Sequence, residues 1–593
     1  MKRNKLYKGF FFLGCSLLMG GLSSCDDFLT IHPSNQITEE EYWKDKSDLE
    51  SAVAGCYKQE LSSSIIGKMI YWGEARSDNF DLLTSGWTEM KDYMNANLTS
   101  TNSITNWSDF YKTIGYCNNV LKHGPKVVDA DKSFSEEDWK PIQAEMKALR
   151  ALNYFYLVRA FRDVPLNFTA VSTDKEALKQ KKRQNTAEEV LTAIINDLDS
   201  VKDDGMRNYG STKYDKGRFS RWSIYTLLAD IYLWRASKNA SADSVAKYPD
   251  NSGDGYPSQS ARDYAKVIEY CDVVLNHYMD EYDKNSGHKT TVVDEDNPYH
   301  LNTINVSGLN ENVSDNVYST IFDQCNSSEG IFELQFDGSK NTNSILSSRS
   351  STGLYTSSSA DAGDYQASSP CQSVSDDMDP KGNLYAKTDI RRWESMVYTE
   401  AGQKVFPIGK YVSSEIIHKN LEDNSEGATI TKKTTLGNSN WIIYRLSDIL
   451  LMKAEALNYL YDDDAHREEA FNLVTTLLYR ANPTVTDSKK RLSIADYNSQ
   501  STMAELIMRE RRREFFAEGK RWFDLVRMAE REGSTTNMLS LLLTKYSSNS
   551  SAIKAKTSSL NSLYNPVYKD EIKVNTNLYQ NPVWDKAETI TRN

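Results

Sequence analysis

Apolar residues recur every three or four positions in several separate stretches of this chain, and that spacing is the strongest constraint on its fold. It places the apolar side chains of each stretch on one face of a helix. The clearest examples are residues 146–161, 222–236 and 446–457. Each is followed by a second periodic stretch, at residues 190–198, 267–275 and 470–477 respectively. The pattern predicts helical hairpins, and Thr186 and Glu189 are spaced to form a capping box.

An earlier pair of helices is predicted at residues 42–57 and 107–121, which makes four pairs. Paired helices with aromatic and alanine residues on facing sides suggest tetratricopeptide-like hairpins. The pairs are unevenly spaced, so inserts must interrupt the repeats; a generic helical bundle is the alternative. We therefore predict a mainly α fold, in which four tetratricopeptide-like helix pairs form a scaffold for a large loop-rich region with short strands.

The stretches outside these helices differ in composition. Residues 285–440 are rich in Ser, Thr, Asn and Gly, and Gly330–Phe336 alternates as a strand does. Residues 341–382 are predicted to form a long polar loop of the kind that often binds a ligand. The expected boundaries are a helical scaffold mainly at 40–280 and 440–530, a loop-rich region mainly at 62–105 and 285–440, and a C-terminal loop segment at 547–593.

A highly charged run at Arg509–Arg527 is predicted to be one helix. Its glutamates alternate with its arginines, so Glu510 can pair with Arg513, and Glu514 with Arg511, three residues apart. The alternation leaves little net positive charge, which argues against nucleic-acid binding. The aromatic residues of the run are expected to pack this helix against the core.

Charge and hydropathy narrow the class of protein. Lysine and arginine number 70 against 82 acidic residues, which gives a net charge of −12 and no electrostatic footprint for nucleic acid. A mean hydropathy of −0.60 excludes a polytopic membrane protein. The chain is predicted to be large, acidic and globular.

The N-terminus resembles a bacterial lipoprotein signal. A positive segment with Lys2, Arg3, Lys5 and Lys8 precedes an uncharged apolar stretch at Gly9–Leu22. That stretch spans about 21 Å as a helix, too short for a membrane span of about 30 Å. Small residues then precede Cys25. We predict a signal peptide at residues 1–24 and a lipid anchor on Cys25; an ordinary cleavage site beside a chance cysteine is the alternative.

Neither a metal site nor catalysis is indicated. The five cysteines beyond Cys25 are far apart and lack a CxxC motif, so we expect free thiols rather than disulfides or zinc ligands. The seven histidines are dispersed, and the nucleophile, phosphate-binding and metalloprotease motifs are missing. We predict a protein that is not an enzyme and needs no cofactor. A glycosidase is the enzymatic alternative, because carboxylate pairs are recognised only in space.

Several segments in the same order resemble the SusD/RagB family of outer-membrane nutrient-binding lipoproteins. They run from Cys25 to Trp584 and comprise Cys25–Leu29 with Pro33 and Tyr42-Trp43, Asn118–Leu121, Arg150–Val158 with Asp163–Leu166, Tyr444–Ala456, Arg509–Arg527 and Gln580–Pro582. The resemblance implies four tetratricopeptide-like helix pairs with variable loops built on them. It also implies a lipid-anchored protein on the cell exterior that captures oligosaccharide for a SusC-like TonB-dependent outer-membrane barrel.

Other functions fit the same scaffold. A member of the family can bind peptides instead of glycans, and a surface scaffold or adhesin would use the helix hairpins to bind proteins. In the family reading, the helical face contacts the barrel and the loops hold the ligand.

Candidate ligand-binding residues follow from the chemistry of sugars. A neutral oligosaccharide needs aromatic platforms for its C–H faces, and Arg, Asn or Asp for adjacent hydroxyls. Arg76, Asp78, Asn79 and Trp87 supply both within one stretch, and the resemblance places the ligand site in this region. Tyr355 and Tyr365 in the long loop are further candidates. The alternative is that Trp87 packs in the core and Arg76 forms a structural ion pair; Trp72 is expected in the core.

Overall fold

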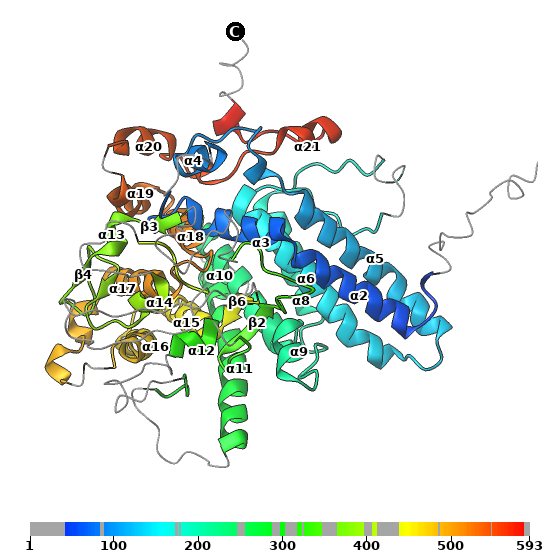
Figure 1. Cartoon of the computed structure of the whole chain (residues 1–593), viewed down its shortest axis with the longest axis horizontal. Coiled ribbons are helices and arrows are strands. Elements are labelled where there is room, and N and C mark those ends of the chain that lie inside the picture. Colours follow the sequence, from blue (N-terminus) through cyan, green and yellow to red (C-terminus); the bar gives the residue numbers. More distant parts are fainter. Residues whose placement is uncertain are drawn as a thin grey trace, which may run out of the picture.

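The four predicted hairpins are all present, and helices make up most of the fold (Figure 1). The pairs are α2 (Lys46–Glu60) with α5 (Ser108–Ala130), α6 (Glu136–Phe161) with α8 (Ala187–Asp199), α10 (Arg221–Val245) with α11 (Gln259–Ser286), and α15 (Leu446–Leu460) with α16 (Asp464–Ala481). Successive pairs also contact each other, because α5 packs on α6 and α11 packs on α15. The hairpins therefore stack side by side as the sequence predicts.

The computed structural model describes residues 42–585 with internal gaps. The gaps are 83–87, 172–175, 177–178, 246–254, 287–296, 303–316, 323–324, 347–364, 397–405, 412–437, 484, 486 and 547. Three predictions lie outside the described residues: the lipid anchor at Cys25 with its signal peptide, and the ligand contacts of Trp87 and Tyr355.

Local capping fixes where the central helices begin. The Thr186–Glu189 capping box at the start of α8 is confirmed, and Ser135 and Asp138 form another at the start of α6. Every residue of α6 from Ala148 to Phe161 is buried, and in Figure 1 this helix lies beside α2 and α8. A helix covered on all sides needs no polar face.

The charged run near the C-terminus forms two helices, so the prediction of one helix is wrong. They are α17 (Gln500–Glu514) and α18 (Arg521–Glu532). Between them Ala517 and Gly519 have φ values of 63° and 70°, which a continuing helix cannot contain. The Glu510–Arg513 pair is confirmed at 2.8 Å.

The second predicted pair in this run is wrong. Glu514 pairs with Arg445 at 2.5 Å, and Arg511 pairs with Asp524 of α18 at 2.8 Å. Both side chains are buried, so they bind partners from other elements rather than each other along the helix surface.

Strands are few and short. The predicted strand is confirmed as β2 (Gly330–Leu334), which pairs antiparallel with β6 (Trp441–Arg445). β1 (Phe80–Leu82) pairs antiparallel with β3 (Tyr365–Ala367), and β4 (Val374–Ser375) runs parallel to β5 (Tyr385–Ala386).

All three segments expected to be rich in loops, residues 62–105, 285–440 and 547–593, contain helices. Residues 62–105 include α3 (Ser63–Ile70), a π-helical turn at Tyr71–Ala75 and α4 (Thr88–Met94). Residues from Ile65 to Ile70 are buried, so the polar and apolar alternation that identifies a surface helix is missing there. The remaining short helices are α9 (Thr212–Gly217), α12 (Val317–Phe322), α13 (Ser369–Gln372), α14 (Arg391–Ser395), α19 (Thr536–Leu542), α20 (Ser550–Lys556) and α21 (Lys569–Val574).

One continuous apolar core joins the hairpins to the segments around them. Trp72 lies in it as predicted, 1% exposed, and its indole N–H donates to the carbonyl of Ile104 at 2.8 Å. The five described cysteines are free thiols. Within the described part of the chain, none of the helices combines the length and apolarity needed to cross a bilayer.

Candidate functional site

Arg76 is buried beneath the C-terminal part of the chain. Its guanidinium donates to the carbonyls of Leu563 and Ser562 at 2.9 and 3.0 Å and lies 4.2 Å from the centre of the Trp522 ring. Burial lowers the pKa of Arg76 to about 10. The side chain is structural, as the alternative interpretation held, but its partners are carbonyls rather than a carboxylate.

Asp78 holds two arginines of the α17–α18 hairpin. Its carboxylate accepts from Arg521 at 2.8 Å and lies 3.3 Å from Arg512. Burial alone would raise the pKa of Asp78, but the two guanidiniums outweigh that effect and hold its pKa well below the usual range. The carboxylate therefore stays charged and ties the N-terminal segment to the hairpin.

Asn79 also contacts the α17–α18 hairpin. Its amide donates to Glu74 at 2.7 Å, and its amide oxygen accepts from Arg512 Nε at 2.8 Å. Burial raises the pKa of Glu74 to about 7. Arg76, Asp78 and Asn79 are each at most 2% exposed, so a ligand reaches them only by displacing these partners.

The pairing of β1 with β3, which together form the β1–β3 ribbon, fixes the two chain positions that adjoin the predicted binding segments. Leu82 at the end of β1 pairs with Tyr365 at the start of β3. The segment that carries Trp87 therefore leaves the ribbon at the end where the segment that carries Tyr355 enters it. Tyr365 itself is fully buried, with its ring 5.4 Å from that of Phe80, so it supports the ribbon from inside.

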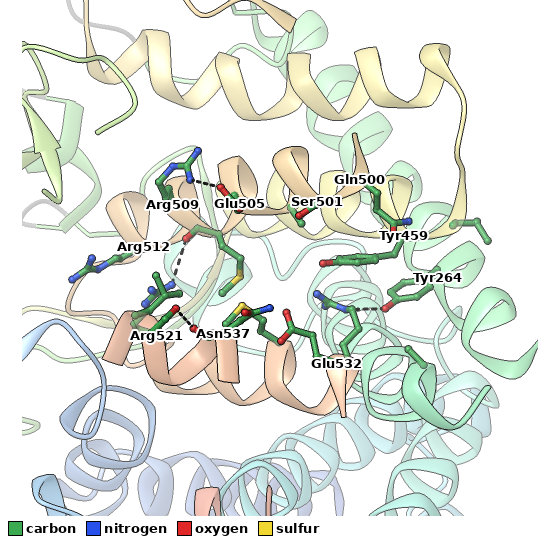
Figure 2. A pocket seen from close by; sticks show the side chains of 18 of the residues that line it. Tyr264, Tyr459, Gln500, Ser501, Glu505, Arg509, Arg512, Arg521, Glu532 and Asn537 are labelled. Atoms are coloured by element: carbon green, nitrogen blue, oxygen red, sulfur yellow. Dashed lines mark hydrogen bonds and ion pairs between the residues drawn. The ribbon is translucent and has the colours of Figure 1, made fainter. Parts of the chain in front are cut away.

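A cavity of about 1310 Å³ lies beside the α17–α18 hairpin (Figure 2). α17 and α18 contribute the largest share of its walls, and the start of α11, the end of α15, α19 and residues 380–384 contribute the rest together with Ala240. Its volume exceeds the roughly 300–1,000 Å³ of ordinary ligand pockets. Sequence reasoning missed this cavity.

Arginines gather at one end of the cavity. Figure 2 shows Arg509, Arg512 and Arg521 there, and Arg513 also lines the wall. Of the carboxylates that hold them, Glu505 lines the cavity and pairs with Arg509 at 3.3 Å, whereas Asp78 and Asp379 lie behind the wall. Asp78 serves Arg512 and Arg521, while Asp379 serves Arg509 at 2.6 Å and Arg513 at 3.0 Å.

Aromatic residues form the opposite end. Arg531 lies 3.8 Å above the ring of Tyr459 and donates from Nε to the Tyr264 hydroxyl at 3.2 Å. Both tyrosines face this end of the cavity in Figure 2. One end of the cavity is therefore lined by guanidinium groups held in fixed positions, and the other end by aromatic rings.

The predicted residues and the cavity are connected. Asp78 and Asn79 lie behind the wall and hold the arginines in place, although they do not line it. The charged run at Arg509–Arg527 was the sequence signal closest to this site. Its pattern indicates a charged helix, but the spacing does not reveal which side chains line a cavity.

Comparisons with known proteins identify the chain. Residues 398–584 match the model of the SusD family, and residues 27–233 match a SusD-like model described as starch-binding and associating with the outer membrane. The chain belongs to the SusD/RagB family. As a member of this family of binding proteins, it is not an enzyme.

Relatives and solved structures of the SusD family cover most of the chain. SusD-like protein P38 of Formosa agariphila is 26% identical, over 86% of this chain and 89% of the relative. SusD-like protein P2 of the same organism is 23% identical over the same shares. A SusD superfamily protein of Bacteroides vulgatus superposes with a TM-score of 0.61 at 16% identity, covering 92% of this chain and 100% of that one. Another from Bacteroides thetaiotaomicron gives 0.60 at 19% identity, with 92% and 99% covered.

Proposed function

We propose that the protein captures oligosaccharides at the outer surface of the outer membrane and delivers them to a SusC-like TonB-dependent transporter. One matching family model is described as starch-binding and associating with the outer membrane. This description supports both the binding of a sugar and the location at the outer membrane. The N-terminal lipoprotein signal with Cys25 supports attachment through lipid.

The observation that carries the binding site is the pairing of Leu82 with Tyr365. Trp87 follows Leu82 by five residues and Tyr355 precedes Tyr365 by ten, so the pairing supports a site to which both aromatic side chains contribute. Two aromatic side chains on adjoining segments supply the platforms that sugar rings need. The buried Arg76–Asn79 segment fixes the base of this ribbon, because Ser368 donates to the carbonyls of Asp78 and Asn79 at 2.6 and 2.7 Å.

A glycan screen of the mature protein tests the proposal. We expect one class of oligosaccharide to be retained, and Trp87→Ala and Tyr355→Ala to weaken its binding about tenfold each. Tyr214→Ala is the matched control, because Tyr214 is an aromatic residue 59% exposed on α9 and away from the ribbon.

Retention of peptides but no oligosaccharide would replace this function with peptide capture. Unchanged binding in both aromatic variants would reject the ribbon segments as the site. Delivery is tested separately by co-purification with a SusC-like transporter from the same cells, which both aromatic variants should preserve.

A further inference from the structure

At the arginine end of the cavity beside α17 and α18, one arginine has a buried donor atom that the described residues leave without an acceptor. Arg513 is 1% exposed and lines the cavity; its Nε donates to Glu510 and its Nη1 to Asp379. Its Nη2 has no hydrogen-bond partner among the described residues. A buried guanidinium N–H without an acceptor is costly, so the site favours a group that accepts from it.

Two of the neighbouring carboxylates, Asp78 and Asp379, are each shared by two arginines and do not line the cavity, whereas Glu505, which pairs with Arg509 at 3.3 Å, does line it. Both oxygens of Asp78 accept from Arg521, and one of them also lies 3.3 Å from Arg512; Asp379 serves both Arg509 and Arg513. Lys381, an exposed residue of the wall, adds a further positive charge. A ligand carboxylate suits this end better than a hydroxyl, because hydrogen bonds between ionised groups are roughly twice as strong as neutral ones.

The rest of the cavity suits a saccharide attached to that group. Its walls combine Tyr264 and Tyr459 with Met508, Met528 and Leu541, which offer apolar surface for the C–H faces of sugar rings. Polar side chains of α17 and α19 lie between these ends.

We propose that this cavity is a second binding site, separate from the β1–β3 ribbon, for an oligosaccharide that carries a carboxylate. The positive charge of the arginine end, Arg513 included, holds the carboxylate, and the sugar rings extend toward the two tyrosines. The saccharide part rests on the proposed function, whereas the position and the preference for a carboxylate rest on the cavity itself.

The test compares acidic and neutral ligands of equal length. Tetramers of galacturonate, glucuronate and mannuronate are titrated by calorimetry into the mature protein, each beside its carboxyl-reduced tetramer. We expect at least one acidic tetramer to bind about tenfold or more tightly than its reduced partner. Arg513→Gln is expected to remove that difference.

Two further variants apply if Arg513→Gln does not fold. Arg509→Gln changes a partly exposed arginine of the same wall, and Ala504→Trp fills the cavity without changing its charge. Both should weaken the acidic tetramer about tenfold. The matched control is Arg183→Gln, which changes an exposed arginine outside the cavity. Trp87→Ala should leave the ratio of acidic to reduced binding unchanged.

Equal binding of every acidic tetramer and its reduced partner would overturn the second site while leaving the proposed function standing. Full binding in Ala504→Trp, or loss of the acidic preference in Trp87→Ala, would also overturn it. If an aspartate-rich peptide binds and no saccharide does, both this inference and the proposed function are rejected.

Discussion

Glu60 at the end of α2 is a carboxyl group enclosed in the core. It is fully buried and accepts from the Asn153 amide at 2.6 Å. Burial raises the pKa of Glu60 from its ordinary 4.5 to about 7, and the hydrogen bonds that it accepts offset only part of this rise. The folded protein therefore keeps a proton that the unfolded chain releases at lower pH.

The sign of the pH effect follows from this difference. Between about pH 4.5 and pH 7 the folded state binds more protons at Glu60 than the unfolded state does. The contribution of Glu60 to the free energy of unfolding is therefore greatest below the lower value and is lost as the pH rises through the upper one.

We predict that Glu60→Gln raises the free energy of unfolding at about pH 8 by roughly 1–3 kcal/mol, and changes it little near pH 4.5. Glutamine keeps the acceptor for Asn153 but cannot ionise. Urea unfolding at both pH values measures the effect. Glu50→Gln on the exposed face of α2 is the control and should show no such dependence. Parallel pH profiles for Glu60→Gln and the unaltered protein would contradict the prediction.

The residues proposed from sequence show why contact partners are hard to foresee. Arg, Asp and Asn are the residue types that a sugar site needs. In Arg76, Asp78 and Asn79, however, the same side chains form hydrogen bonds with buried carbonyls and arginines. Their partners lie more than 400 residues away in the chain, so local sequence cannot distinguish the two roles. The cavity was missed for the same reason, since its lining comes from several distant elements.

Among the elements, the turn between α17 and α18 is held by a close backbone contact. A Cβ atom on Gly73 would lie 1.7 Å from the carbonyl oxygen of Gly519, and Gly519 itself has a φ of 70°. Only glycine fits both positions without moving the backbone. Through this contact, the π-helical turn at Tyr71–Ala75 packs against the turn between α17 and α18, the two helices that carry the arginines of the cavity.

We predict that Gly73→Ala lowers the free energy of unfolding by roughly 1–3 kcal/mol or more, because the new methyl group meets backbone that cannot yield cheaply. Gly55→Ala in α2 is the matched control: its Cβ would meet nothing within 4 Å. There the substitution should stabilise the helix by roughly 0.5–1 kcal/mol. Thermal unfolding of both variants decides the matter, and equal melting temperatures would reject the clash.

Periodicity predicted the elements that have one apolar face. All four hairpins and β2 appear where the spacing indicated. It failed for α3, whose residues from Ile65 to Ile70 are buried on every side, and for the break in the charged run. The positive φ values of that break depend on tertiary contacts such as the one with Gly73, which the local sequence does not display.

At the scale of the whole molecule, the lipid anchor remains a prediction. Cys25→Ala should move the protein from the membrane fraction to the soluble or unprocessed fraction, because each buried CH₂ of the acyl chains contributes about 0.8 kcal/mol to anchoring. Cell fractionation with a labelled fatty acid measures this. Cys325→Ala, at a partly buried free thiol, should retain both the label and the membrane location. A Cys25→Ala protein that stays in the membrane would exclude this anchor.

The long-range contacts of Arg76 also set an order of events during synthesis. A ribosome completes Arg76 almost five hundred residues before Leu563, whose carbonyl the guanidinium needs. Lys545 likewise caps the carbonyls of Ser77 and Phe80 from the far end of the chain. Until the C-terminal part of the chain is synthesised, Arg76 and the carbonyls of Ser77 and Phe80 lack these partners. These buried groups therefore obtain their C-terminal partners only when synthesis is nearly complete.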